Sequence, residues 1–377
     1  MKMRSQTVCY FFAIILVCLI VPLPKAFAAI WYVDGTKSLS GDGANWGNAF
    51  VSIQEAISNE NVQEDDEVWV IASTYFISTD IMVNKAIGIY GGFTGSESVR
   101  SQRDWSQNQT IIDGQSLVDH CINISADATI DGFTVTGGYS NGGASGIEYF
   151  GGGLIALNSA PVIANCTFED NFSQMGGAGL DTWLSSPTIT GCVFRRNNSV
   201  AGGAMRFRDS TVLISDSLFE DNVAEGKGGG IYAWDTSIIV TNTDFLNNET
   251  LGDGGGFMSN NGDATFENCT FVGNESDSGG AIQTDGETII NQSSFEGNTS
   301  NWYGGAIVNS GSSMTISSSV FEDNDARTGG AIYNSVGDLS ISNCAIYSNE
   351  VSLYAAGIYV NDGSLRISYS TLSDNIA

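Results

Sequence analysis

Acidic, aromatic and basic residues that could together bind a sugar recur at intervals of 25 and 26 residues in the middle of the chain. The six residues of this set are Asp181, Trp183, Arg206, Arg208, Tyr232 and Trp234. If their segments stack as parallel strands, equivalent side chains lie about 5 Å apart on one exposed surface. Indole faces would receive the apolar faces of sugar rings, and the arginines would bind carboxylates of an acidic glycan. The alternative is structural, because Arg208 between two indoles makes cation–π contacts of about 0.5–1 kcal/mol.

Residues for polysaccharide hydrolysis do not form a complete set. A hydrolase similar to the polygalacturonases would carry Asn-Thr-Asp, paired Asp, Gly-His-Gly and Arg-x-Lys. The chain has Asn242-Thr243-Asp244 and Asp65-Asp66, but the one histidine, His120, has no glycine beside it, and Arg-x-Lys is absent. We therefore expect His120 to be structural.

A lyase would need carboxylates that hold Ca²⁺ and a basic side chain that removes a proton. Lys37, Lys85 and Lys227 are the lysines after residue 28, so an arginine would have to serve. No calcium-binding motif accompanies them. We expect no catalytic residues, no metal site and no cofactor, with Ca²⁺ kept as an alternative that no motif supports.

A repeat of 24 to 26 residues must position the candidate residues. Nine units each end in an asparagine that follows an apolar position by three residues. The closing residues are Asn171, Asn197, Asn222, Asn248, Asn274, Asn298, Asn324, Asn349 and Asn375. Such a constant period indicates one structural unit stacked on itself.

Alternating apolar residues show that the unit is built from strands. Like residues also recur from unit to unit: Ile189 is followed by Ile214, and Phe194 by Phe219. In-register parallel strands produce such columns. The sequence predicts an all-β fold, a right-handed single-stranded parallel β-helix (solenoid) with three short strands in each coil.

Two kinds of small polar residue are expected inside the coils. The closing asparagines are predicted to form an inward hydrogen-bonded ladder, although sequons such as Asn248-Glu249-Thr250 leave glycosylation as the alternative. Four of the five cysteines after residue 28 share a column with Ser and Thr, so we expect buried free thiols rather than disulfides. They are Cys166, Cys192, Cys269 and Cys344.

The chain divides into three parts. Residues 1–28 resemble a signal peptide, with Lys2 and Arg4 before an apolar run and Ala26-Phe27-Ala28 as the cleavage site; an uncleaved anchor is the alternative. Residues 29–110 are expected to hold the first strands and a capping helix near residues 48–59, with Asn48 as its N-cap. Residues 111–377 hold the repeats, with an insertion at 137–151. The C-terminal end is expected to be uncapped or truncated, and to pair with a downstream domain or another chain.

The chain is strongly acidic, with 42 Asp and Glu against 14 Lys and Arg and a net charge of −28. This excess disfavours nucleic acid as a partner. One local exception is Arg195-Arg196, whose equivalents one coil before and after are Glu169-Asp170 and Glu220-Asp221. Stacking is expected to place the arginines between the two acidic pairs.

The pattern Gly-Gly-Ala-Ile followed by Phe-x-x-Asn resembles the repeat of chlamydial polymorphic outer membrane proteins. It is also similar to secreted bacterial right-handed β-helix proteins with a pectin-lyase-like fold. The resemblance implies export to the extracellular space or the outer-membrane surface of a bacterium. It further implies an adhesin-like stalk or passenger that binds a glycan or a host-surface ligand. A carbohydrate-active enzyme, or an inactive sugar-binding relative, is the alternative on this fold.

Overall fold

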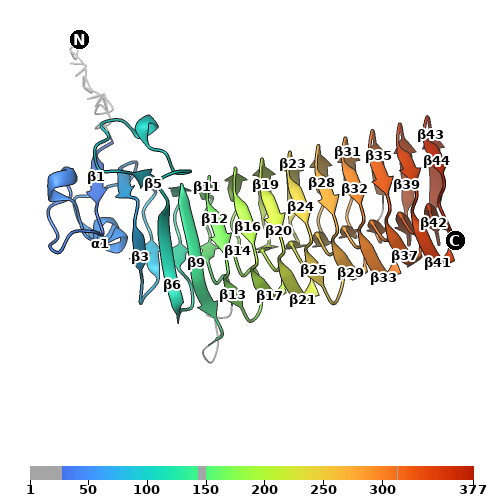
Figure 1. Cartoon of the computed structure of the whole chain (residues 1–377), viewed down its shortest axis with the longest axis horizontal. Helices are drawn as coiled ribbons and strands as arrows, with labels where there is room; N and C mark the ends of the chain where they lie inside the picture. Colours follow the sequence, from blue (N-terminus) through green and yellow to red (C-terminus); the bar gives the residue numbers. More distant parts are fainter. Residues whose placement is uncertain (1–27, 143–149, 312) are drawn as a thin grey trace, which may run out of the picture.

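The computed structural model describes residues 28–142, 150–311 and 313–377, and its strands wind into a parallel β-helix (Figure 1). Coils are stacked along one long axis, with the first strands at one end and the C-terminus at the other (Figure 1). The all-β prediction is confirmed. Residues 1–27, most of the predicted signal peptide, and residues 143–149, part of the predicted insertion, lie outside the described residues. Within the described part, no helix has the length and apolarity needed to cross a membrane.

Two continuous parallel sheets form two walls of the solenoid. Sheet A contains β1 (Ile30–Val33), β2 (Glu67–Ile71), β5 (Gly88–Phe93), β8 (Thr129–Asp131), β11 (Val162–Ala164), β15 (Thr188–Thr190), β19 (Thr211–Ser215), β23 (Ser237–Thr241), β27 (Ala264–Glu267), β31 (Thr288–Asn291), β35 (Ser313–Ser317), β39 (Asp338–Ser342) and β43 (Ser364–Ser368). Sheet C contains β4 (Ile81–Val83), β7 (Ile122–Ile124), β10 (Leu154–Leu157), β14 (Leu180–Trp183), β18 (Met205–Arg208), β22 (Ile231–Trp234), β26 (Phe257–Asn260), β30 (Ile282–Thr284), β34 (Ile307–Asn309), β38 (Ile332–Asn334) and β42 (Ile358–Val360).

The remaining strands form sheets B and D, which share strand β9 (Phe133–Ser140). Sheet B also contains β3 (Thr74–Phe76), β6 (Thr110–Val118), β12 (Thr167–Glu169), β16 (Val193–Arg195), β20 (Leu218–Glu220), β24 (Asp244–Leu246), β28 (Thr270–Val272), β32 (Ser294–Glu296), β36 (Val320–Glu322), β40 (Ala345–Tyr347) and β44 (Thr371–Ser373). Sheet D also contains β13 (Phe172–Ser173), β17 (Asn198–Ala201), β21 (Val223–Lys227), β25 (Glu249–Thr250), β29 (Glu275–Ser278), β33 (Thr299–Tyr303), β37 (Asp325–Thr328) and β41 (Glu350–Tyr354).

The prediction of three strands in each coil was wrong, because a repeating coil holds four. The chain leaves sheet B, bends sharply and enters sheet D within two residues. In one coil the bend is Asp170-Asn171, where Asp170 has a φ of 55°. A short polar residue tolerates this left-handed conformation, so an Asp or Asn can turn the chain without a long loop.

The N-terminal cap is a shorter helix than predicted. Helix α1 spans Ile53–Ser58, and its N-cap is Ser52, whose hydroxyl accepts the Glu55 N–H. Asn48 instead ends the 3₁₀ helix η1 (Trp46–Asn48). A second 3₁₀ helix, η2, spans Arg100–Gln102. Helix α1 buries Ile53, Ala56 and Ile57 and contacts β1, β2 and β4. It therefore covers the open end of the first coils.

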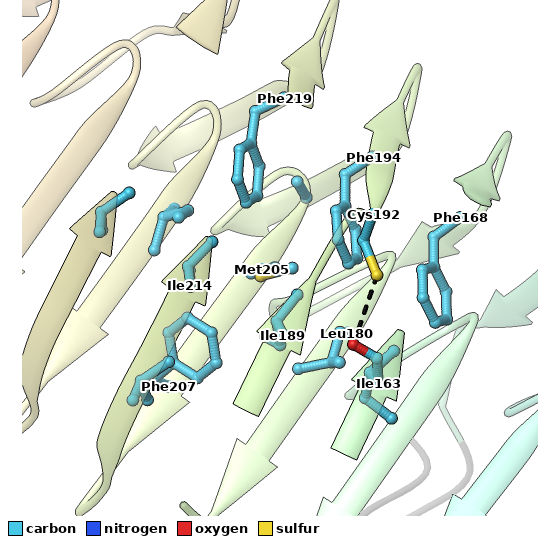
Figure 2. Close-up of a cluster of buried hydrophobic side chains, with 14 of the residues drawn as sticks. Ile163, Phe168, Leu180, Ile189, Cys192, Phe194, Met205, Phe207, Ile214 and Phe219 are labelled. Carbon is cyan, nitrogen blue, oxygen red and sulfur yellow. Dashed lines mark hydrogen bonds between the residues drawn. The ribbon is translucent and has the colours of Figure 1, made fainter. Parts of the chain in front are cut away.

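The predicted columns form the core (Figure 2). One phenylalanine in each coil is fully buried, and successive rings stack with centroids 4.6 to 5.2 Å apart. This column consists of Phe168, Phe194, Phe219, Phe245, Phe271, Phe295 and Phe321. The five described cysteines are buried free thiols. One of them, Cys192, donates to the Ile163 carbonyl at 3.5 Å across the interior (Figure 2). These residues pack as small core side chains.

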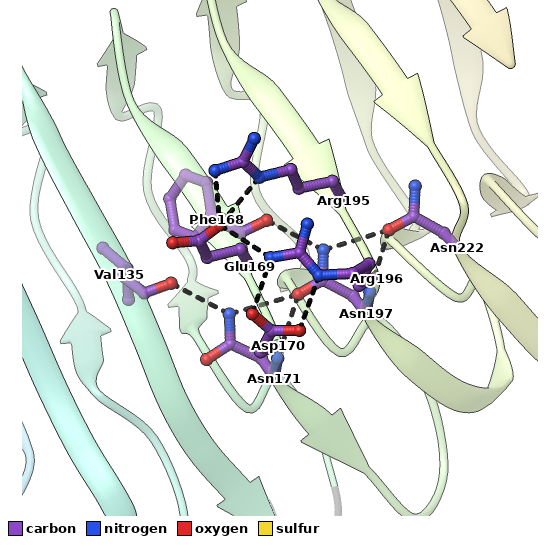
Figure 3. Close-up of polar contacts among 9 residues, drawn as sticks. All are labelled: Val135, Phe168, Glu169, Asp170, Asn171, Arg195, Arg196, Asn197 and Asn222. Atoms are coloured by element: carbon purple, nitrogen blue, oxygen red, sulfur yellow. Dashed lines mark hydrogen bonds and ion pairs between the residues drawn. The ribbon is translucent and has the colours of Figure 1, made fainter.

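The asparagine ladder is confirmed (Figure 3). Asn171 Nδ2 donates to Asn197 Oδ1 at 3.1 Å, and Asn197 Nδ2 donates to Asn222 Oδ1 at 3.0 Å. The same bond continues from coil to coil as far as Asn375. The side chain of Asn248 is fully buried, so the glycosylation alternative was wrong for that sequon.

The predicted charge ladder forms on one side only. Arg195 contacts Glu169 at 2.7 Å, and Arg196 contacts Asp170 at 2.7 Å and Glu169 at 3.0 Å (Figure 3). Among the described residues, the ion pairs of both arginines go to this preceding coil rather than to both neighbours.

The last coil exposes apolar side chains, as predicted. Leu365, Ile367 and Leu372 are 41%, 39% and 44% exposed. Pairing of this end with a further domain or another chain stays a prediction.

Candidate functional site

Strands β14, β18 and β22 are successive neighbours in sheet C and bring the six candidate residues together. Trp183 pairs in register with Arg208, which pairs with Trp234. Each strand follows a glycine corner whose first residue has a φ between 59° and 69°, a conformation that glycine adopts without strain. These corners are Gly177, Gly202 and Gly228. The constant corner keeps the strands in register, and alternation along each strand turns the candidate side chains away from the core.

In the first predicted column the two indoles are exposed and Arg208 between them is mostly buried, with a side chain that is 13% exposed, while the second column is buried. Trp183 and Trp234 are 44% and 48% exposed, as expected of an open aromatic surface. Asp181 is fully buried, and the neighbouring Arg206 and Tyr232 are 7% and 8% exposed, so the prediction that this second column is exposed was wrong.

Segments before the glycine corners cover the second column. The backbone carbonyl of Met175 accepts a hydrogen bond from Arg206 Nη1 at 3.3 Å. The ring of Phe150 lies 4.3 Å from the Arg206 guanidinium and 4.4 Å from that of Arg208. We name the group formed by Phe150, Asp181, Arg206 and Arg208 the arginine cluster.

Two guanidinium groups in the arginine cluster share one carboxylate. Asp181 accepts hydrogen bonds from Arg206 Nε at 2.7 Å and from Arg208 Nη2 at 3.1 Å. Burial raises the pKa of the Asp181 carboxyl, while both guanidinium groups oppose this rise. Burial also lowers the pKa of Arg208, which the Asp181 carboxylate opposes. With Asp181 ionised, these three side chains carry one excess positive charge.

Two nitrogen atoms of the arginine cluster lack hydrogen-bond acceptors within the described part of the chain. Among the described residues, Arg206 Nη2 and Arg208 Nε are buried and have no hydrogen-bond partner. A buried donor without an acceptor is costly, so a ligand acceptor or water placed there would be bound favourably. An anion would also offset the excess charge.

The cation–π prediction is confirmed for one indole only. The Arg208 guanidinium lies 4.9 Å from the Trp183 ring centroid. Within the described residues, its other aromatic partner is Phe150 rather than Trp234. The Trp234 ring is therefore not a cation–π partner of Arg208.

Sequence reasoning missed Phe150, which packs on both guanidinium groups. It lies at the end of the insertion, directly before the Gly151-Gly152-Gly153 corner. The only signal available was its place next to a glycine corner, because the repeat pattern gives no register for an insertion. Its isolated bridge with Gly176 shows that it enters the stack one coil before the candidate strands.

The incomplete hydrolase residues are not brought together. The Thr243 side chain is buried and donates to the Thr241 carbonyl at 2.8 Å, while Asp66 binds Trp31 Nε1 near the N-terminal cap. His120 is buried, with Nδ1 2.8 Å from the Gly151 carbonyl, and its structural role stays a prediction. The described residues contain no group of three or more His, Cys, Asp or Glu placed to hold a metal.

Comparisons with known proteins support the fold. The sequence matches the family described as "Right handed beta helix region" over residues 89–249 and 229–377. A search of the curated proteins finds no match. Pectate lyase Pel9A is structurally similar, with a TM-score of 0.52 and 14% identity over 90% of this chain and 78% of that one. PfbA, a surface adhesin of Streptococcus pneumoniae, gives a TM-score of 0.51 and 12% identity over 82% of this chain and 85% of that one. At such identities the likeness shows the fold alone.

Proposed function

This chain belongs to the right-handed beta helix family, and we propose that it is an exported, surface-displayed binding protein for an anionic glycan. The binding surface is the Trp183–Arg208–Trp234 column together with the arginine cluster beneath it. The amino-terminal residues 1–28, read as a signal peptide, support export. An adhesin-like role agrees with the fold that this chain shares with a surface adhesin.

The observation that carries this proposal is the excess of buried donors in the arginine cluster. Within the part of the chain that the structure describes, two guanidinium groups pair with one carboxylate, which leaves a positive charge and two N–H groups without a partner beside the exposed indoles. A sugar carboxylate or sulfate would approach the partly exposed Arg208 side chain, which is 13% exposed, and would offset the excess charge, while the indoles receive the ring faces.

The acidic remainder of the protein contributes selectivity. With a net charge of −28, most of the surface repels an anionic polymer. An anionic glycan therefore gains favourable contacts mainly where the arginines lie. Binding is expected to weaken as salt is added, because screening shortens the range of this attraction.

A glycan array with uronate-containing, sulfated and neutral oligosaccharides tests the proposal. The Trp183→Ala/Trp234→Ala variant and the Arg208→Gln variant should each lose at least tenfold in affinity for an anionic glycan. Matched controls are Trp105→Ala and Arg366→Gln, which remove an exposed indole and an exposed guanidinium elsewhere. Undiminished binding by folded Trp183→Ala/Trp234→Ala protein would exclude this surface.

A carbohydrate-active enzyme is the second candidate. A lyase needs a basic side chain that removes a proton, and Arg208 is the partly exposed arginine beside the indoles. A polysaccharide lyase would release unsaturated uronate ends from a polyuronate, with activity lost in Arg208→Gln. Tight binding of the same polymer without such products would favour the binding protein.

A further inference from the structure

An open groove lies on sheet D and is lined by residues of strands β29, β33, β37 and β41. It has a volume of about 650 Å³. Its lining includes Asp277, Asn301, Trp302, Asp325, Arg327 and Ser352. It begins four coils beyond β14, about 19 Å along the axis, and on a different sheet from the arginine cluster. The two sites therefore share no residue.

Trp302 provides a flat apolar surface in this groove. Its side chain is 45% exposed, and the Arg327 guanidinium lies 5.1 Å from the ring centroid. This cation–π contact restrains the orientation of the indole. A restrained aromatic ring loses little conformational entropy when a ligand stacks on it.

The fold does not require tryptophan at this position. Tyr303 belongs to a column of register partners that includes Lys227 and Asp253 in earlier coils. Trp302 directly precedes Tyr303, whereas Gly226 precedes Lys227 and Gly252 precedes Asp253. Glycine suffices in those coils, so the half-exposed indole is not needed to close a coil.

The polar lining favours an uncharged ligand. Asn301 Nδ2 donates to Asp277 Oδ1 at 2.7 Å, which fixes an amide and a carboxylate beside the indole. Asp325 pairs in register with Glu350, so two carboxylates stack on neighbouring coils. Burial, followed by the Glu350 charge, raises the pKa of Asp325. The groove lining holds one guanidinium, that of Arg327, and two carboxylates, those of Asp277 and Asp325, which disfavours an anionic sugar and reverses the balance in the arginine cluster.

We propose that the groove is a second glycan-binding site, specific for an uncharged sugar that stacks on Trp302 and hydrogen-bonds to Asn301 and Asp277. Hydroxyl groups suit amide and carboxylate partners, and the apolar ring face suits the indole. This inference goes beyond the proposed function and stands whether or not the arginine cluster binds an anionic glycan.

The test is titration of the full chain with neutral cello-, xylo- and manno-oligosaccharides, and with oligogalacturonates for comparison. At least one neutral oligosaccharide should bind, and Trp302→Ala should reduce its affinity at least tenfold. Trp105→Ala, which removes an exposed indole outside both sites, is the matched control and should leave neutral-sugar binding unchanged. Asn301→Ala should also weaken binding while leaving the indole in place, which separates loss of a contact from loss of fold.

The outcomes separate the two sites. Neutral-sugar binding that survives in folded Trp302→Ala protein would overturn the inference, as would the absence of any neutral-sugar binding at millimolar concentration. Loss of oligogalacturonate binding in Trp302→Ala would also overturn it, because the ligand class would be wrong. If only the proposed anionic site is wrong, oligogalacturonate binding would be unchanged in the Trp183→Ala/Trp234→Ala variant, while Trp302→Ala would still lose neutral-sugar binding.

Discussion

Replacing Asn197 by alanine should destabilise the β-helix by about 4 kcal/mol. The Asn197 side chain makes four hydrogen bonds of 2.9 to 3.2 Å. It accepts from the Asn171 backbone N–H and Nδ2, and it donates to the Phe168 carbonyl and Asn222 Oδ1. Each bond contributes about 0.5–1.5 kcal/mol, so their loss costs about 2–6 kcal/mol. The buried Asn171 N–H is left without this acceptor, which favours the middle to upper part of that range.

Asn198 supplies a control in the next position. It is exposed on β17, so Asn198→Ala is expected to change stability by less than about 0.5 kcal/mol. Both variants would be unfolded with guanidinium chloride while circular dichroism is recorded. Because solenoids can unfold in parts, amide exchange at Asn171 and Asn222 provides a local measurement. Equal losses in the two variants, or unchanged amide protection at Asn171, would refute the ladder as a source of stability.

Three further predictions follow from the packing and the charges. Arg195→Glu combined with Arg196→Glu should lower the melting temperature more at low than at high salt, since exposed ion pairs are screened; equal losses at both would contradict this. Phe245→Ala should cost about 3–5 kcal/mol in chemical denaturation, because it removes one fully buried ring from a continuous stack; a loss below 1 kcal/mol would show that the column closes over the gap. Burial raises the pKa of Cys121 to about 12 and that of Cys269 to about 11, so iodoacetamide at pH 8 should modify these thiols only after unfolding; rapid labelling of folded protein would show that the coils open.

Side-chain type and spacing were enough to predict the solenoid and its register. Columns of Ile and Phe at a period near 25 residues require in-register stacking, and each column was found inside. The pairing of Trp183 with Arg208, and of Arg208 with Trp234, followed from the same repeat length. Each coil's neighbours are the adjacent coils in sequence, so few alternative topologies remained.

Local turn geometry was harder to predict. The sharp bend at Asp170-Asn171 depends on one left-handed residue, and many Asp and Asn residues in the chain adopt other conformations. The N-cap of helix α1 is Ser52 rather than the predicted Asn48. Both residues are good caps, but Phe50 pairs with β1, with its N–H donating to the Tyr32 carbonyl, so the helix begins only after this extended residue.

The sequence alone determined that Asp181, Arg206 and Tyr232 form one column on successive coils, because their spacing equals the repeat. Only the tertiary structure decided that this column is buried. Phe150 and the Met175 carbonyl reach it from segments outside the regular pattern, and no periodicity encodes where such segments lie. Among the described residues, burial in turn leaves two guanidinium groups with one carboxylate and with unsatisfied donors, a property that arises from packing rather than from residue type.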